Sequence, residues 1–180
     1  MRVQLTPHPA LGHPDLTIDA EAEREGTELL LRYAVRGEVG RIRLPAASAQ
    51  ASRRDELWRH TCFEAFVRPA RSEAYHELNL SLSNDWAFYH FEKRRSVRSN
   101  PDVPHLTFDY AAQTDRLTVR ASIDLATLVS PAVPWELNLT AVIEDQAGNL
   151  SYWALAHPPG VPDFHDPDCF VLELPPPTAE

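Results

Sequence analysis

Lysine, cysteine and methionine are scarce in this sequence. Lys93 is the only lysine among 17 basic residues, and neither a phosphate-binding loop nor a Schiff-base motif surrounds it. Cys62 and Cys169 are the only cysteines, too few for a secreted disulfide framework, and both lie among apolar strand residues. The sequence therefore argues against lysine-dependent nucleotide or imine chemistry and predicts two buried, reduced thiols.

Long apolar runs are also missing. No stretch is long enough to span a bilayer, and the N-terminal segment "MRVQLTPHPALGHPDL" has no apolar run of signal-peptide length. The 26 acidic residues outnumber the 17 basic ones, and the net charge of −9 repels phosphate backbones. We expect a cytoplasmic protein that binds neither membranes nor nucleic acid.

Proline-rich turns and two-residue alternation dominate what is present. Sixteen prolines and few helical patterns favour an all-β chain. The expected strands are 2–6, 16–22, 27–36, 39–44, 61–68, 74–82, 86–92, 105–110, 116–124, 135–144, 150–157 and 169–174. The polar segments "AAQTDR" and "DQAGN" predict antiparallel hairpins. These patterns predict a two-sheet antiparallel β-sandwich, jelly-roll-like, as one domain over 1–174 with a disordered tail at 175–180.

Four of these strands, 27–36, 74–82, 116–124 and 135–144, alternate between an apolar and a polar side. Segment 58–68 departs from this pattern, because Glu64 shares its side with apolar neighbours. Burying a carboxylate is costly unless it is paired or hydrogen-bonded, so Glu64 is predicted to have a partner. Arg120 and a ligand donor are the candidates.

The polar sides of these strands are predicted to converge on one sheet. The patch would contain Glu64, Tyr75, Glu77, Asn79, Arg120 and Asn138, rimmed by Trp58, Trp86 or Trp153. Paired donors and acceptors beside flat rings suit a polyhydroxylated sugar. The alternative is that these are solvent-facing strand residues with incidental aromatics.

Three segments, "LWRHTCFEAFV", "YHELNLSLSNDWAFYHF" and "LSYWALAHPPGVPDFHDPDCFVLEL", carry a resemblance to bacterial DOMON-like domain proteins, which in turn resemble family 9 carbohydrate-binding modules. The resemblance covers most of 25–174. It implies a jelly roll that binds sugars or haem on one face, usually without catalysis. In the sugar-binding modules a tryptophan precedes a strand glutamate by six residues, as Trp58 precedes Glu64, and a second aromatic stands before the last strand. Phe164 occupies that position, where the modules have tryptophan.

Haem is a second ligand that the resemblance allows. Haem-binding relatives use methionine with histidine or lysine, and Met1 is the only methionine, so a Met/His pair is not expected. A bis-histidine site remains open, without a spacing that favours it, among His60, His76, His90, His157 and His165.

The segment "DFHDPD" offers metal-ligand chemistry. Asp163, His165, Asp166 and Asp168 could hold a cation such as a structural calcium. Aspartates that cap turns explain the same string more simply, because the spacing matches no recognised metal motif. We therefore assign no metal and no cofactor, and we interpret this loop as a rigid lid over the predicted site.

The sequence thus predicts a non-catalytic domain that binds a small ligand, with a saccharide as the first choice. Trp58 and Phe164 are the predicted stacking groups, His157 and His165 the predicted rim, and His60 a further ligand-binding residue. Two alternatives stay open: an enzyme that uses Glu64 and Glu77 as a carboxylate pair, and a protein whose exposed aromatics bind a partner. Trp86, Tyr89 and Phe91 are predicted to be sandwich core, and the following "EKRR" a solvated exit from the strand.

Overall fold

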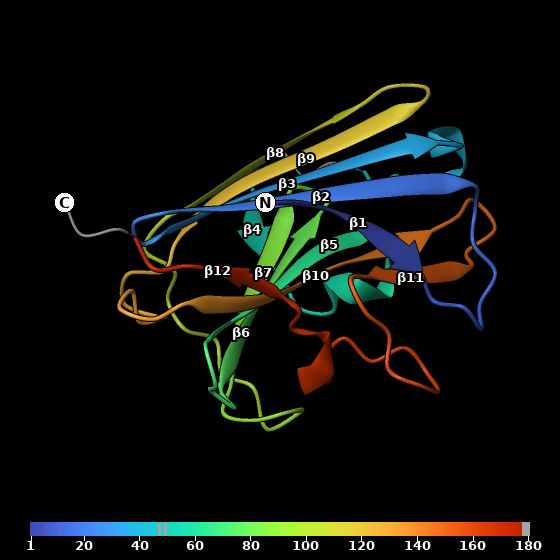
Figure 1. Cartoon of the computed structure of the whole chain (residues 1–180). Coiled ribbons are helices and arrows are strands. Elements are labelled where there is room, and N and C mark those ends of the chain that lie inside the picture. Colours follow the sequence, from blue (N-terminus) through green and yellow to red (C-terminus); the bar gives the residue numbers. More distant parts are fainter. Residues whose placement is uncertain (47, 49, 178–180) are drawn as a thin grey trace.

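A computed structural model describes residues 1–46, 48 and 50–177 of the chain (Figure 1). Twelve strands make up the fold. Their bounds are β1 Arg2–Pro7, β2 Leu16–Glu25, β3 Glu28–Gly37, β4 Ser52–Arg53, β5 Cys62–Pro69, β6 Tyr75–Ser81, β7 Asp85–Phe91, β8 Leu106–Ala112, β9 Arg116–Asp124, β10 Trp135–Glu144, β11 Leu150–Ala154 and β12 Leu172–Leu174. Three 3-10 turns accompany them, η1 Val39–Arg41, η2 Leu57–Arg59 and η3 Pro167–Cys169. Over the described residues, no helix has the length and apolarity to cross a membrane.

The strands form two layers that face each other (Figure 1). Sheet A has the order β1-β2-β3-β9-β8, and sheet B has the order β4-β7-β6-β5-β10-β11, with β12 beside the first residues of β10. Strand β1 belongs to both sheets, because Leu5 pairs with Ile18 of β2 while Thr6 pairs with Ala154 of β11. Every strand pair is antiparallel except β4 with β7. The predicted all-β sandwich is confirmed.

The main core lies between the layers and uses the apolar sides that the alternation predicts. One cluster contains Phe63, Ala65 and Val67 of β5, Leu78 and Leu80 of β6, and the apolar side of β9. The same core holds the alternating residues Trp135, Leu137, Leu139, Ala141 and Ile143 of β10. Burial of these side chains is the main force that holds the two sheets together.

Sheet B also buries its outer face, which the alternation does not predict. A second apolar cluster covers it, made by Leu57, Cys62, Phe66, Tyr75, Ala87, Tyr89, Phe91, Val142, Ala154, Phe164 and Phe170. The segment 155–171 and turn η2 supply the covering side chains, with the Phe164 ring edge-on to Phe66. As a result every residue of β6 is buried, and its polar side does not face solvent.

Three expected elements differ in detail. Segment 39–44 is a 3-10 turn followed by an isolated bridge from Ile42 to Asp145, because Gly37 (φ 107°) turns the chain away from the sheet. A side chain at Gly37 would place its Cβ 2.4 Å from the Asp15 carbonyl oxygen. The strand expected at 169–174 is shortened to β12 by η3, and the strand expected at 150–157 ends at Ala154.

The remaining segments follow the expectations more closely. Both predicted hairpins are present, joining β8 to β9 and β10 to β11. Part of the predicted disordered tail, 178–180, lies outside the described residues.

Candidate functional site

A cavity of about 330 Å³ opens on the outer face of sheet B, within the second apolar cluster. Strands β5, β6, β7, β10 and β11 form its floor, and η2 and the segments 95–98 and 162–165 form its walls. Its lining consists of Trp58, Glu64, Phe66, Glu77, Phe91, Arg95, Ser96, Arg98, Val142, Tyr152, Pro162, Phe164 and His165. This volume and this mixture of rings with a few polar groups are typical of a small-molecule site.

Two carboxylates, Glu64 and Glu77, lie in the floor and are only 3% and 4% exposed. Glu64 stands opposite Asn79 in the ladder between β5 and β6, and Glu77 stands opposite Phe66, so the carboxylates are diagonal neighbours. Thr140 donates a hydrogen bond to Glu64 Oε2 (3.1 Å), and Asn79 Nδ2 donates one to Glu77 Oε1 (2.6 Å). Glu64 Oε1 is buried without a hydrogen-bond partner.

Burial sets the protonation of this pair. It raises the pKa of Glu64 well above its usual range, and the charge of Glu77 raises that pKa further. Burial also raises the pKa of Glu77, to about 7, against the hydrogen bond from Asn79 and the nearby arginines. Burial therefore favours the protonated form of Glu64, whose carboxyl group can donate as well as accept a hydrogen bond.

The thiol of Cys62 belongs to the same network. Its Sγ lies 3.5 Å from Asn79 Oδ1, and burial raises the pKa of the thiol well above its usual value. Both cysteines are buried and unpaired, which confirms the prediction of reduced, buried thiols. The raised pKa keeps Cys62 a thiol, and hence a poor nucleophile.

Two arginines line the wall of the cavity. The Arg98 guanidinium stacks 4.3 Å from the Tyr89 ring centroid and 5.3 Å from that of Trp58, and it pairs with Asp55 at 3.3 Å. Arg95 pairs with Asp163 at 2.9 Å. Sequence reasoning missed Arg95 because the run "EKRR" after β7 was interpreted as solvated, and it did not consider Arg98. The run follows a strand whose outer side carries Tyr89 and Phe91, and this was the signal that basic side chains adjoin an aromatic cavity.

The loop before β12 roofs the cavity and is fastened at several points. Asn138 Nδ2 donates to the Phe164 carbonyl oxygen (3.0 Å), and Tyr75 Oη lies 2.8 Å from His165 Nδ1. Asp163 accepts from both Arg94 (2.5 Å) and Arg95. Burial, with the charge of Arg95, lowers the pKa of His165 to about 4, so its imidazole is neutral at pH 7.

The aspartates of this loop act as turn caps and ion-pair partners. Asp166 accepts the Asp168 backbone N–H at the start of η3 and pairs with Arg94 at 3.0 Å, while Asp163 accepts the His165 N–H. This confirms the turn-capping interpretation of "DFHDPD". In the described part of the chain, no group of three or more His, Cys, Asp or Glu side chains could hold a metal ion.

The structure sorts the predicted site residues into three groups. Those that line the cavity are Trp58, Glu64, Glu77, Phe164 and His165. Those that support the lining by hydrogen bonds are Tyr75, Asn79 and Asn138. Those that lie elsewhere are His60, Arg120, Trp153 and His157. Of the five histidines considered for haem, His165 alone lines the cavity.

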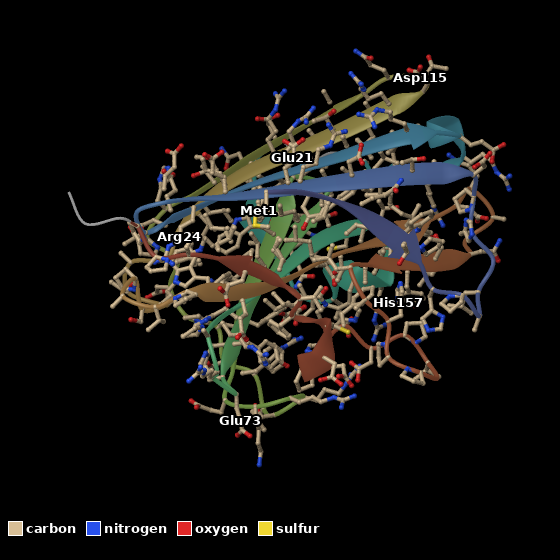
Figure 2. The ribbon with its side chains drawn as sticks, viewed as in Figure 1. Met1, Glu21, Arg24, Glu73, Asp115 and His157 are labelled. Atoms are coloured by element: carbon tan, nitrogen blue, oxygen red, sulfur yellow. The ribbon has the colours of Figure 1, made fainter. Side chains whose placement is uncertain are left out.

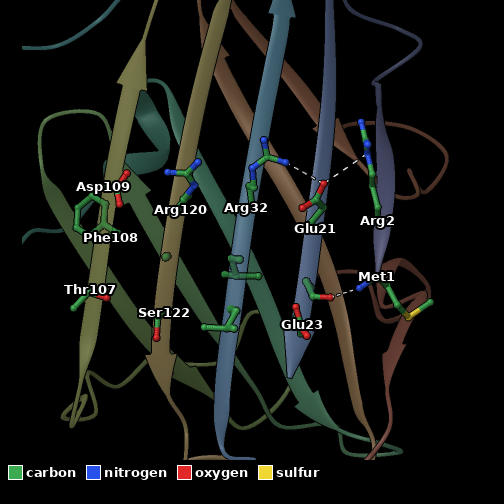
Figure 3. A pocket seen from close by; sticks show the side chains of 14 residues that line it. Met1, Arg2, Glu21, Glu23, Arg32, Thr107, Phe108, Asp109, Arg120 and Ser122 are labelled. Carbon is green, nitrogen blue, oxygen red and sulfur yellow. Dashed lines mark hydrogen bonds and ion pairs between the residues drawn. The ribbon is translucent and has the colours of Figure 1, made fainter. Parts of the chain in front are cut away.

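Arg120 lies in the other sheet. It stands on β9 opposite Arg32 of β3, at the outer face of sheet A (Figure 3). The suggestion that Arg120 pairs with Glu64 is therefore wrong, and Thr140 is the partner that the structure provides. Two strands that are distant in the sequence can share a polarity pattern and still belong to opposite layers.

Three further predicted site residues, Trp153, His60 and His157, also lie outside the cavity. Trp153 is 2% exposed in the main core, where its Nε1 donates to Ser151 Oγ, and its neighbour Tyr152 lines the cavity instead. His60 Nδ1 lies 2.7 Å from Glu144 Oε2, and His157 Nε2 lies 2.8 Å from the Thr6 carbonyl oxygen. None of these three side chains lines the cavity.

The aromatics of β7 divide between the two faces of sheet B. Trp86 is half-buried against the main core, whereas Tyr89 and Phe91 belong to the second cluster, and Phe91 lines the cavity. The prediction that all three are sandwich core is therefore correct only for Trp86.

Comparison with solved structures finds the same architecture in carbohydrate-binding proteins. A putative carbohydrate-binding protein from Bacteroides uniformis superposes with a TM-score of 0.65 at 14% identity, over 86% of this chain and 76% of that one. A family 9 carbohydrate-binding module from Caldicellulosiruptor kristjanssonii, in complex with cellotriose, gives 0.53 at 12% identity, over 83% and 70%. The same module with glucose gives 0.52 at 12% identity, over 83% and 71%. At these identities the likeness establishes the fold.

No family model matches the chain, and no curated protein sequence matches it either.

Proposed function

We propose that this protein binds a saccharide, without catalysis, in the cavity on the outer face of sheet B. The observation that carries the proposal is the unpartnered, buried Oε1 of Glu64 in the floor of an aromatic-lined cavity. A buried polar atom without a partner is costly, and a sugar hydroxyl that enters the cavity would remove this cost. The carboxyl group of Glu64, whose protonated form burial favours, matches a hydroxyl, because both groups donate and accept.

The walls suit the rest of a pyranose ring. Trp58 and Phe164 offer flat apolar faces for its C–H groups, and Tyr152 packs against Phe164 at 6.1 Å between ring centroids. Arg95, Arg98 and Glu77 provide further donors and acceptors at the edge. The loop is fastened before any ligand enters, which lowers the entropy lost on binding. The sugar complexes of the family 9 module with the same fold add support.

Isothermal titration calorimetry with a saccharide panel that includes glucose and cellotriose tests the proposal. We expect at least one sugar to bind, with Trp58→Ala weakening its affinity by about tenfold or more through the lost stacking surface. The matched control is Phe108→Ala, which removes a half-buried aromatic from sheet A and leaves the affinity unchanged. Binding of no sugar by the folded wild-type protein refutes the proposal.

A carboxylate-dependent glycoside hydrolase is the second candidate. The observation that favours it is the presence of two buried carboxyl groups, Glu64 and Glu77, in one cavity, since such enzymes place two carboxyl groups around the scissile bond. Turnover of chromogenic glycosides that Glu64→Gln abolishes would support this candidate. A lack of turnover on substrates that bind in the calorimeter eliminates it.

The resemblance to DOMON-like proteins and the cytoplasmic location belong to the same proposal. The three segments that carry the resemblance contribute Trp58, Glu64, Glu77 and Phe164 to the cavity. Detection of the protein in a soluble cytoplasmic fraction, against periplasmic and membrane markers, tests the location.

A further inference from the structure

A second cavity, of about 430 Å³, adjoins the first one. Both cavities include His165 in their linings, and Tyr75, which bonds His165, lines the second. The second cavity lies at the end of sheet B that carries the turn between β5 and β6. Glu73 of this turn is labelled in Figure 2, where it lies at the end of the molecule away from Glu21 of sheet A.

The second cavity is positively charged, whereas the whole chain is negatively charged. Its lining carries four basic side chains, Arg68, Arg71, Lys93 and Arg94, and Glu73 is its only acidic one. The chain as a whole has a net charge of −9, and its single lysine is among these four residues. A local excess of positive charge in an acidic protein indicates a site for an anion.

Two of the four cations are already neutralised within the protein. Arg68 pairs with Glu136 at 2.7 Å and stacks on Phe170, and Arg94 pairs with Asp163 and Asp166. Within the described residues, Arg71 and Lys93 have no ion-pair partner. These two side chains are exposed and remain available to a ligand.

The backbone of the two cavities supports a ligand role. Arg71 (φ 68°) and Arg95 (φ 52°) both adopt the left-handed conformation, which favours glycine or asparagine. Arg71 lines the second cavity and Arg95 the first. Arginine at such positions has an energetic cost, and residues held in this way concentrate at ligand sites.

We infer that the saccharide carries an acidic group, and that Arg71 and Lys93 receive this group in the second cavity while the sugar ring occupies the first. The inference rests on the proposed function of the first cavity. His165, which lines both cavities and is held by Tyr75 Oη, would contact the ligand between its ring and its acidic group. A carboxylate, a sulfate or a phosphate ester shares the required chemistry, because each accepts charge-assisted hydrogen bonds from guanidinium and ammonium groups.

The test compares glucose, glucuronate and glucose 6-phosphate by calorimetry, with inorganic phosphate alone as the fourth probe. We expect at least one acidic sugar to bind about fivefold or more tightly than glucose, and the preference to shrink at 0.5 M salt, as expected of exposed charges. The double variant R71Q/K93Q should lose this preference and keep its affinity for glucose. Glu73→Gln, the control at the same rim, should retain or increase the preference.

Each outcome decides between the two proposals. Equal affinity for neutral and acidic sugars, or a preference that R71Q/K93Q retains, overturns the inference and leaves saccharide binding intact. Failure of all sugars to bind overturns both. Binding of inorganic phosphate as tight as that of the sugar phosphate, unaffected by Trp58→Ala, identifies an anion site without a sugar and also overturns the inference. Because Arg71 and Lys93 are exposed, these variants are expected to fold, which circular dichroism can verify.

Discussion

The outer faces of sheets A and B carry similar residues in opposite surroundings. Across sheet A, a row of charged side chains runs from Arg2 through Glu21, Arg32 and Arg120 to Asp109, one from each strand (Figure 3). Glu21 pairs with Arg32 at 3.1 Å and with Arg2 at 3.7 Å. The hollow beside this row measures about 600 Å³, larger than either cavity of sheet B.

The difference lies in what covers each face. No segment covers the outer face of sheet A over the described residues, and there the hydrogen bond from Arg2 holds the pKa of Asp19 below its usual value. Sheet B is roofed by segment 155–171 and η2, and burial there raises the pKa of Glu64 and Glu77. The larger hollow has self-neutralising charges and only Phe108 as an aromatic. The covering segment, rather than the size of the cavity or the strand pattern, therefore distinguishes the cavity of sheet B, the proposed ligand site, from the outer face of sheet A.

The largest difference between the two sheets is expected in the stability lost when an aromatic ring is removed. Phe66 is fully buried in the second cluster, so Phe66→Ala should lower the free energy of unfolding by about 3–5 kcal/mol. Phe108→Ala on sheet A should cost about 1 kcal/mol, since its ring is half-buried. Urea denaturation of both variants measures the contrast. Equal losses would mean that segment 155–171 contributes little to the packing of sheet B.

The two faces should also differ in how stability depends on pH. The folded pKa of Glu77, about 7, exceeds its ordinary value of 4.5, so its stabilising contribution is complete below pH 4.5 and is lost as the pH rises through 7. The loss is on the order of 3 kcal/mol, and Glu64 acts in the same direction. The urea midpoint should fall from pH 5 to pH 8 in the wild type, and it should fall less in Glu77→Gln, where Glu64 still contributes.

For Asp19 of sheet A, the change of stability with pH has the opposite sign. Its pKa is depressed, so its contribution is present above pH 3.8 and is lost as the pH falls through the folded value. An Asp19→Asn variant should therefore differ from the wild type mainly above pH 4, with no change in the slope between pH 5 and pH 8. A flattened slope in this variant would place the titration in sheet A.

The smallest expected contrast concerns two aspartates that each accept two arginines. Asp163 binds Arg94 and Arg95 beside the cavity, and Asp19 binds Arg2 and Arg36 on sheet A, with similar side-chain exposures of 12% and 14%. Asp163→Asn and Asp19→Asn should each destabilise the fold by about 1 kcal/mol or less. Calorimetry should show weaker sugar binding for Asp163→Asn alone, because only this change loosens the roof. If both variants weakened sugar binding equally, the loop held by Asp163 would have no specific part in binding.

The sequence predicts the layers of this fold well, since alternation reports which side of a strand meets the core. It also brings Trp58, Glu64 and Phe164 to one cavity through the resemblance. Two kinds of information are missing. Alternation in "LSYWA" does not determine whether Tyr152 or Trp153 faces the core, and it does not say that Arg120 belongs to the other sheet. Both depend on strand pairing between distant parts of the chain.

Strand β1 has one more consequence. Because β1 pairs with β2 of sheet A and with β11 of sheet B, backbone hydrogen bonds connect the two layers along one side only. The opposite side ends in two edge strands, β4 of sheet B and β8 of sheet A. We expect transient separation of the layers to start at those free ends, so backbone amides of β8 should exchange with deuterium sooner than those of β1 and β2. The two layers would then separate about β1 as a hinge. The cavity of sheet B lies on the outer face of that sheet, outside the space between the layers, so this separation need not change it.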